Sequence, residues 1–135
     1  MSRKWNHLWC ITPKIVQIFA VLSFCVTTVL ALLPSNSFAL YTPLFIGVDK
    51  LKHVIAFIIL TVLLRAGWPK TIRIHQTVFL LVYGLMLECI QSTHLIGRVF
   101  SFFDLVADIL GIALGLILAQ LGSKVLQHGS WIRFT

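Results

Sequence analysis

Side chains that could do chemistry are few in this chain and are gathered in one region. The 135 residues include only four carboxylates, Asp49, Glu88, Asp104 and Asp108. Three of these acids fall in the segment 88–108, which also contains Arg98. His53 joins the set, because it lies four residues after Asp49 and so shares one face of a helix with it. Carboxylates near a guanidinium can bind a charged group, and carboxylates with a histidine can transfer protons.

Almost everything else in the chain is apolar. Hydrophobic residues make up 59% of the sequence and charged residues 11%, and the mean hydropathy is +0.96. A water-soluble domain of this size needs a polar surface that these side chains cannot supply, so the composition indicates a membrane protein with the lipid bilayer as its partner. The formal charge of +7 does not indicate nucleic-acid binding, because the basic residues are dispersed singly between apolar runs.

Four segments are apolar enough to cross a bilayer, whose core of roughly 30 Å takes about 20 helical residues. They cover residues 15–33, 48–64, 77–91 and 103–121. The sequence therefore predicts an all-α integral membrane bundle of four transmembrane helices. The membrane domain covers residues 15–122, and it lies between an N-terminal segment, 1–14, and a C-terminal tail, 123–135.

The distribution of Lys and Arg predicts the orientation of this bundle. Eight of these residues lie before the first span, between the second and third, or after the fourth. Three lie on the opposite side: Lys50, Lys52 and Arg98. Short loops rich in Lys and Arg stay in the cytoplasm. We therefore expect a multi-pass protein of the cytoplasmic (inner) membrane, with both termini in the cytoplasm and the loops 34–52 and 92–102 outside.

The first 39 residues also resemble a secretory signal, with a basic start, an apolar core and the sequence SFA at 37–39. The apolar run of 19 residues at 15–33 is longer than the usual signal core, which favours an uncleaved anchor. Cleavage would leave three spans in the same orientation, so the placement of the polar residues does not depend on it.

This orientation places all four carboxylates near the outer ends of their helices. Glu88 and Gln91 are three residues apart on the third segment, with Gly84 one turn below Glu88. On the fourth segment one narrow stripe contains Asp104, Asp108, Gly111, Gly115 and Gly122. Gly111 and Gly115 form a small-xxx-small pattern that lets helices approach closely, either within the chain or in a homo-oligomer. The sequence thus predicts one extracytoplasmic polar cluster.

Several of these residues also have purely structural interpretations. Asp104 could cap the N-terminus of its helix, and Arg98 and Lys50 could extend to lipid phosphates. Glu88 and Asp108 lie inside their spans, where an unpaired charge is costly. Both need a basic partner or a bound proton, and a buried ion pair seldom stabilises a fold better than apolar packing does. This cost favours a functional role for the two acids.

The same residues carry a resemblance to a known family. The stretches DKLKHVIAF at 49–57, GLMLECIQ at 84–91 and GRVFSFFDLVADILGIALG at 97–115 resemble VanZ-like membrane proteins, over roughly residues 45–120. Those proteins share an Asp-Lys-x-x-His opening, a Glu-x-x-Gln, and a Gly-Arg followed by an Asp and a helix rich in small residues. This chain has Asp108 where the family usually has Asn. The resemblance implies a role in the cell envelope and assigns no reaction.

We therefore predict a cell-envelope protein whose outer cluster binds or modifies a lipid-linked or wall precursor. The candidate catalytic residues are Glu88, His53 and Asp108. The candidate ligand-binding residues are Arg98, Lys50, Asp49, Gln91 and Asp104. The predicted helix-packing residues are Gly84, Gly111 and Gly115. The alternative is a non-enzymatic structural or accessory subunit, in which the charges only lock the helices together.

No cofactor is expected from the sequence. The acids and His53 are plausible metal ligands by type, but no HExxH-type spacing supports a metal site. Recognised nucleophile motifs such as GxSxG are also absent from the sequence. Whether the protein is an enzyme therefore stays open at this point.

Overall fold

The computed structural model describes residues 4–33, 43–93 and 101–131, with side chains for 14–33, 50–93 and 101–124. This part of the chain forms four α-helices, which are α1 (Lys4–Leu32), α2 (Pro43–Gly67), α3 (Arg73–Gln91) and α4 (Phe102–Trp131). The described residues contain no strand. The predicted all-α class is therefore confirmed.

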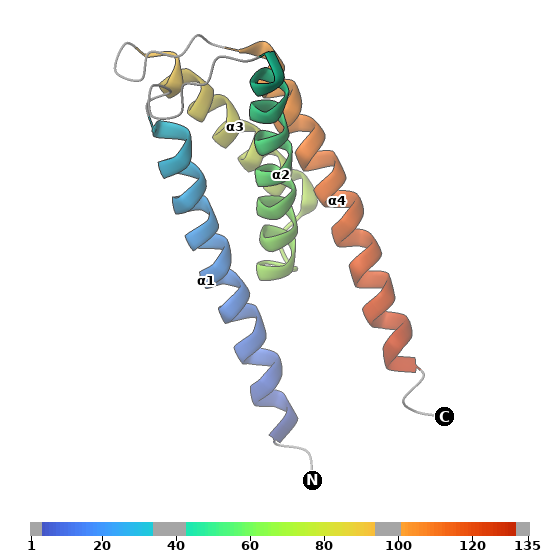
Figure 1. Ribbon diagram of the computed structural model, residues 1–135. Helices are drawn as coiled ribbons and strands as arrows, with labels where there is room; N and C mark the ends of the chain where they lie inside the picture. The colour runs from blue at the N-terminus through green and yellow to red at the C-terminus, as the bar shows by residue number, and fades with distance from the viewer. Residues whose placement is uncertain (1–3, 34–42, 94–100, 132–135) are drawn as a thin grey trace.

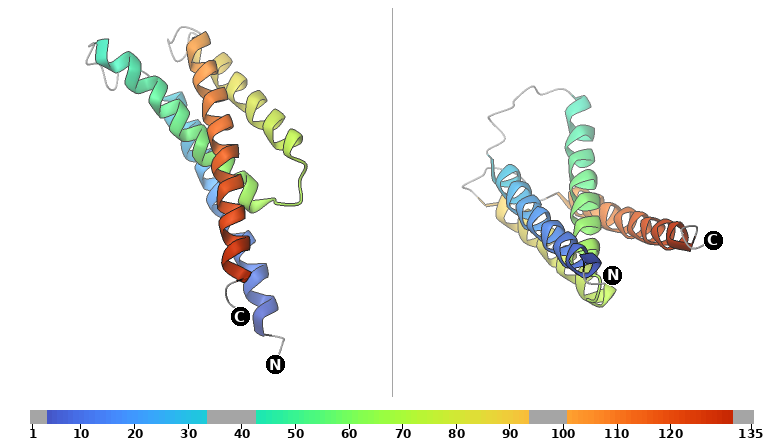
Figure 2. Two further views of the ribbon diagram at one scale, coloured as in Figure 1. Left: turned by 90° about the vertical axis from the view of Figure 1, so that its right-hand side faces the viewer. Right: turned by 90° about the horizontal axis from the view of Figure 1, so that it is seen from below.

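Successive helices run in opposite directions (Figure 1). The start of α1 and the end of α4 lie at one end of the bundle, and the other views agree (Figure 2). The end of α1, the start of α2, the end of α3 and the start of α4 lie at the opposite end, which we call the acidic end. The turn from α2 to α3 contains Pro69, whose ring cannot continue a helix.

Three helices contain a stretch that is long and apolar enough to cross a membrane. These stretches are Lys14–Leu32, Arg73–Gln91 and Phe102–Lys124, and they correspond to three of the four predicted spans. Helix α2 has 25 residues but is not among them. It carries charged side chains near both ends, at Lys50, Lys52 and Arg65.

The outward surface of the helices is apolar. Large hydrophobic side chains such as Ile18, Phe19, Val82 and Leu118 are at least half exposed, from 50% to 59%. In water this surface would be unfavourable, whereas lipid tails solvate it well. The distribution agrees with a membrane protein.

The core lies where α2, α3 and α4 meet. Its buried members are Phe57, Leu60, Leu80, Tyr83, Leu87 and Ile112. Helix α1 joins this core through Phe24, whose ring packs edge-on against Phe79 and Tyr83 at centroid distances of 5.6 and 5.0 Å. The Tyr83 hydroxyl also lies 2.9 Å from Oγ1 of Thr28. These contacts join α1 to α3, and α1 also packs along α2.

Glycines bring α2 and α4 into close contact. A Cβ added to Gly111 would lie 2.6 Å from the carbonyl oxygen of Val54, and one added to Gly115 would lie 2.6 Å from Cβ of Thr61. Gly122 belongs to the same predicted stripe, but a Cβ there would meet no described atom within 4 Å. The packed part of the stripe therefore ends at Gly115, because the helices diverge beyond it.

A polar network fastens the bundle at the end opposite the acids. Gln76 is only 4% exposed, and its Nε2 donates to the carbonyl oxygen of Trp68 at 2.9 Å. Nη1 of Arg65 donates to Oε1 of Gln76 at 2.7 Å. Nε2 of Gln17 on α1 donates to the carbonyl oxygen of Gly67 at 2.8 Å. The sequence did not lead us to expect this network, which satisfies the last carbonyls of α2.

Replacing Gly115 by Ala tests the contact between α2 and α4. The new methyl group would lie 2.6 Å from Cβ of Thr61 and 3.0 Å from the carbonyl oxygen of Ile58. We expect the free energy of unfolding in detergent to fall by about 1–3 kcal/mol, as for other overpacked sites. The matched control is Gly122→Ala, which should be neutral or stabilising because alanine favours helices. Equal stabilities of the two variants would contradict this packing.

Candidate functional site

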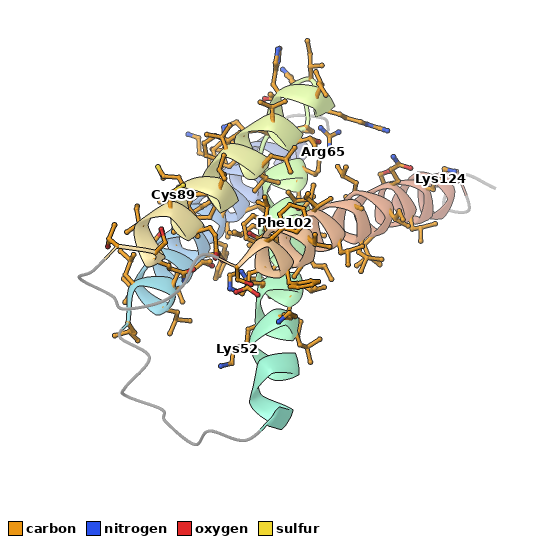
Figure 3. The ribbon with its side chains drawn as sticks, turned by 90° about the horizontal axis from the view of Figure 1, so that it is seen from above. Lys52, Arg65, Cys89, Phe102 and Lys124 are labelled. Carbon is orange, nitrogen blue, oxygen red and sulfur yellow. The ribbon has the colours of Figure 1, made fainter. Side chains whose placement is uncertain are left out.

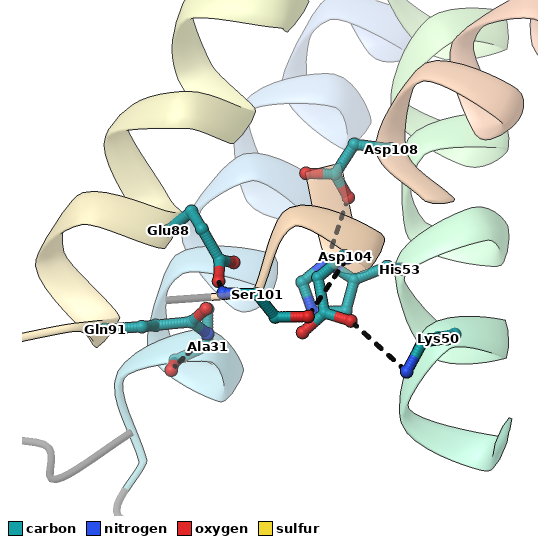
Figure 4. A network of polar contacts seen from close by, with 8 residues as sticks. All are labelled: Ala31, Lys50, His53, Glu88, Gln91, Ser101, Asp104 and Asp108. Atoms are coloured by element: carbon teal, nitrogen blue, oxygen red, sulfur yellow. Dashed lines mark hydrogen bonds and ion pairs between the residues drawn. The ribbon is translucent and has the colours of Figure 1, made fainter. Parts of the chain in front are cut away.

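Polar side chains from three helices meet at the acidic end (Figures 3 and 4). We call the following six residues the polar cluster: Lys50, His53, Glu88, Ser101, Asp104 and Asp108. The first two come from α2, Glu88 comes from α3, and the last three lie at the start of α4. The carboxylates and His53 are close enough to interact electrostatically. The structure therefore brings together side chains that are far apart in the sequence.

His53 and Asp108 form the most direct contact in the cluster. Nδ1 of His53 lies 2.9 Å from Oδ1 of Asp108, and the two side chains are only 13% and 3% exposed. The glycine contact positions this pair, because Gly111 lies one turn after Asp108 and packs against Val54, the residue next to His53. When Asp108 is ionised its carboxylate can only accept, and Nδ1 of His53 is then the donor in this bond.

Glu88 is buried, and only one of its two oxygens has a partner. The residue is 3% exposed. Its Oε1 accepts a hydrogen bond of 2.6 Å from the backbone N–H of Ser101. Its Oε2 is buried and has no hydrogen-bond partner among the residues that the structure describes. A buried oxygen that is left without any partner costs about 1–3 kcal/mol.

Ser101 directly precedes α4, and its backbone N–H explains the direction of the Glu88 side chain. Its Oγ accepts from the backbone N–H of Asp104 at 3.3 Å, as in a capping box. In that motif the acid three residues on usually accepts from the N–H of the capping residue. Here Glu88 from the neighbouring helix takes that place. The N-cap of α4 is thus Ser101, and Asp104 lies in the first turn.

Asp104 is turned toward α2. Its Oδ1 lies 4.0 Å from Nζ of Lys50, and the side chains are 14% and 34% exposed. The same Nζ lies 5.7 Å from the ring centroid of Phe103. A pair this long and this exposed contributes little to stability. Burial in the cluster therefore increases from a partly exposed lysine to a buried glutamate.

Gly84 makes room for the second oxygen of Asp108. A Cβ at this position would lie 2.8 Å from Oδ2 of Asp108 and 3.0 Å from the ring of Phe57. This glycine lies one turn before Glu88 on α3. It therefore lets α3 approach close enough for both carboxylates to share one site.

The remaining predicted site residues are Gln91, Asp49 and Arg98. Nε2 of Gln91 donates to the carbonyl oxygen of Ala31 at 2.9 Å, so its side chain fastens α3 to the end of α1 (Figure 4). Asp49 belongs to α2, one turn before His53, but its side chain is outside the described part. Arg98 lies outside the described residues altogether.

Ser101 is the member of the cluster that the sequence interpretation missed. The signal was present, because Ser-Phe-Phe-Asp at 101–104 has the spacing of a capping box. Among the described residues, no group of three or more His, Cys, Asp and Glu side chains is arranged to hold a metal ion. The arrangement can accept hydrogen bonds or a positive charge at Glu88, and it can move a proton through the His53–Asp108 pair.

Two substitutions measure how much the His53–Asp108 and Lys50–Asp104 pairs contribute to the free energy of unfolding. His53→Leu leaves Asp108 buried without the Nδ1 atom that it contacts, so we expect the free energy of unfolding to fall by about 1–3 kcal/mol. Lys50→Gln removes the long, partly exposed pair with Asp104 and the ammonium near the Phe103 ring, and it should change the free energy of unfolding by less than about 0.5 kcal/mol. Unfolding of both variants in the same detergent makes the comparison. A larger loss for Lys50→Gln would contradict the gradation described above.

Comparison with known proteins supports the resemblance seen in the motifs. The family model described as VanZ/LLP1 matches residues 5–123, which extends beyond the motif-bearing part and includes most of α1. No curated protein and no solved structure matches the chain significantly. Because the match covers most of the sequence, the chain belongs to the VanZ/LLP1 family.

Proposed function

We propose that the polar cluster is a binding site for a molecule of the cell envelope, a lipid-linked or cell-wall precursor, which the protein binds or modifies. The observation that carries this proposal is Oε2 of Glu88, which is buried without a described partner. A helix bundle gains nothing from such an atom, because an apolar side chain at this place would avoid the cost. A bound group that donates to Oε2 would remove the penalty.

The His53–Asp108 pair would supply the chemistry in a modifying reaction. With Nδ1 of His53 donating to Asp108, the neutral imidazole has its basic lone pair on Nε2. Asp108 would orient the ring and stabilise the imidazolium that forms when His53 accepts a proton. Glu88 would then be the second acid–base group. Lys50 and Arg98 would engage a phosphate or carboxylate of the same molecule.

A structural function is the second candidate, and a specific observation favours it. Glu88 accepts from the N–H of Ser101 and so satisfies a donor at the start of α4. The His53–Asp108 and Lys50–Asp104 pairs likewise join α2 to α4. In this alternative the charges only lock the helices, and the protein is an accessory subunit of a larger membrane assembly.

The topology belongs to this proposal as well. Helix α2 would be a fourth span, since it runs antiparallel to both of its chain neighbours and packs in the core of the bundle. The excess of Lys and Arg at the end opposite the acids would place both termini in the cytoplasm of an inner-membrane protein. The polar cluster would then face the outside, where envelope precursors are assembled.

The function is tested with Glu88→Gln. Glutamine keeps the shape and an oxygen acceptor for Ser101 but removes the charge, so the variant should stay folded. Native mass spectrometry of protein extracted from membranes in mild detergent should find an envelope molecule on the original protein. We expect its occupancy to fall about tenfold or more in Glu88→Gln, because one charge-assisted hydrogen bond is lost. The variant should also fail to complement a deletion strain under envelope stress.

Glu88→Leu provides the decisive comparison. If Glu88→Gln loses stability while Glu88→Leu is stable and complements the deletion, the cluster is dispensable for function and the structural alternative is correct. Retained occupancy of the same molecule in both variants would also contradict a binding role for Glu88.

The topology is tested by cysteine labelling. We expect a cysteine at Thr93 to react with a membrane-impermeant maleimide in intact cells, whereas a cysteine at Lys70 should react only after permeabilisation. The native cysteines are replaced by serine in both variants of this pair. The reverse pattern would invert the orientation and place the polar cluster in the cytoplasm.

A further inference from the structure

The polar cluster has more negative than positive groups among its described members. Glu88, Asp104 and Asp108 supply three carboxylates, whereas Lys50 is the permanent cation and His53 is cationic only when it is protonated. Lys50 lies nearest to Asp104, and His53 bonds to Asp108. Each of those two acids is therefore assigned a basic partner. Glu88 is the acid whose contact in the described part of the chain is a neutral backbone N–H.

The second carboxylate oxygen of Glu88, Oε2, lies at a definite place in the bundle. Oε2 is buried within one helical turn of the last residue of α3, and Ser101, which donates to the other oxygen of Glu88, directly precedes α4. In a membrane this is the level at which a lipid headgroup meets the helix ends. Asp104 and Asp108 lie close enough to interact electrostatically with Glu88. A cation that reaches Oε2 would therefore feel three carboxylates.

We infer that this site binds a primary ammonium group of an envelope molecule, with Oε2 of Glu88 as its main acceptor. This inference rests on the function proposed above and names the chemistry of the ligand. An ammonium is compact and has three N–H donors, so it can satisfy Oε2 and neutralise the excess acid at once. A quaternary amine has no N–H to donate. A divalent metal needs several oxygens, and no such group is arranged in the described residues.

Thermal unfolding in detergent micelles tests this chemistry with defined lipids. The full-length protein is compared in phosphatidylethanolamine and in phosphatidylcholine with the same acyl chains, because only the first headgroup has N–H donors. A ligand that binds the native state raises the midpoint of unfolding. We expect phosphatidylethanolamine to raise it by roughly 3 °C or more relative to phosphatidylcholine. Glu88→Gln should abolish this difference, and the exposed, distant control Gln120→Ala should retain it.

A third arm with free ethanolamine separates the two possible sources of the amine. If ethanolamine and the amine lipid both raise the midpoint of unfolding in a Glu88-dependent way, the site binds an ammonium group from either source. A shift with the lipid alone assigns the amine to a headgroup. Equal midpoints in the two lipids, or a difference that persists in Glu88→Gln, overturn the inference. A response to phosphatidylethanolamine that appears only in Arg98→Gln also overturns it, because Arg98 itself would then fill the place.

Failure of this inference can be told apart from failure of the proposed function. Phosphatidylglycerol, which has no amine, is included for that purpose. If it stabilises the protein in a Glu88-dependent way and the amine lipid does not, the ammonium assignment is wrong while a Glu88-dependent binding site remains. If no lipid acts through Glu88 and no molecule co-purifies with the protein, both proposals fall.

Discussion

The close approach of α2 and α4 is the contact on which the rest of the structure depends. Gly111 and Gly115 have no side chains, so the backbone of α4 lies against Val54, Ile58 and Thr61 of α2. In a membrane there is little hydrophobic force between helices, and close packing of small residues supplies much of the attraction. The same contact fixes the rotation of both helices about their axes. That rotation turns His53 and Asp108 toward each other at 2.9 Å.

Helix α3 completes the polar cluster through a different set of contacts. Gly84 lets α3 approach Asp108, and Glu88 then reaches the N-cap residue of α4 as an acceptor for the N–H of Ser101. The two oxygens of this carboxylate thus have different surroundings. Its Oε1 stabilises the start of a helix, and its Oε2 has no partner among the described residues. A residue that served only as a cap would not need to bury its second oxygen.

The two ends of the bundle contrast in how completely their polar groups are satisfied. At the end opposite the acids, Gln76 both donates to Trp68 and accepts from Arg65, so this network is closed. At the acidic end, Glu88 retains an unpaired oxygen among the described residues. Closed networks stabilise a fold, whereas an incompletely paired one is suited to an external partner. This difference supports the proposal of a ligand site at the acidic end.

The sequence by itself determined the class of protein, the extents of three apolar spans and the set of acids that gather at one end. Those properties follow from local composition and from the 3.6-residue period, which need no knowledge of neighbouring helices. Only the tertiary structure decided which partner each side chain meets. In that structure His53 pairs with Asp108, and the side chain of Gln91 turns toward α1. The backbone N–H of Ser101 donates to Glu88 and not to Asp104. The tertiary structure also limited the glycine packing to Gly111 and Gly115 and left Gly122 open. Such choices depend on how helices rotate and cross, and these angles are set by packing between segments distant in the sequence.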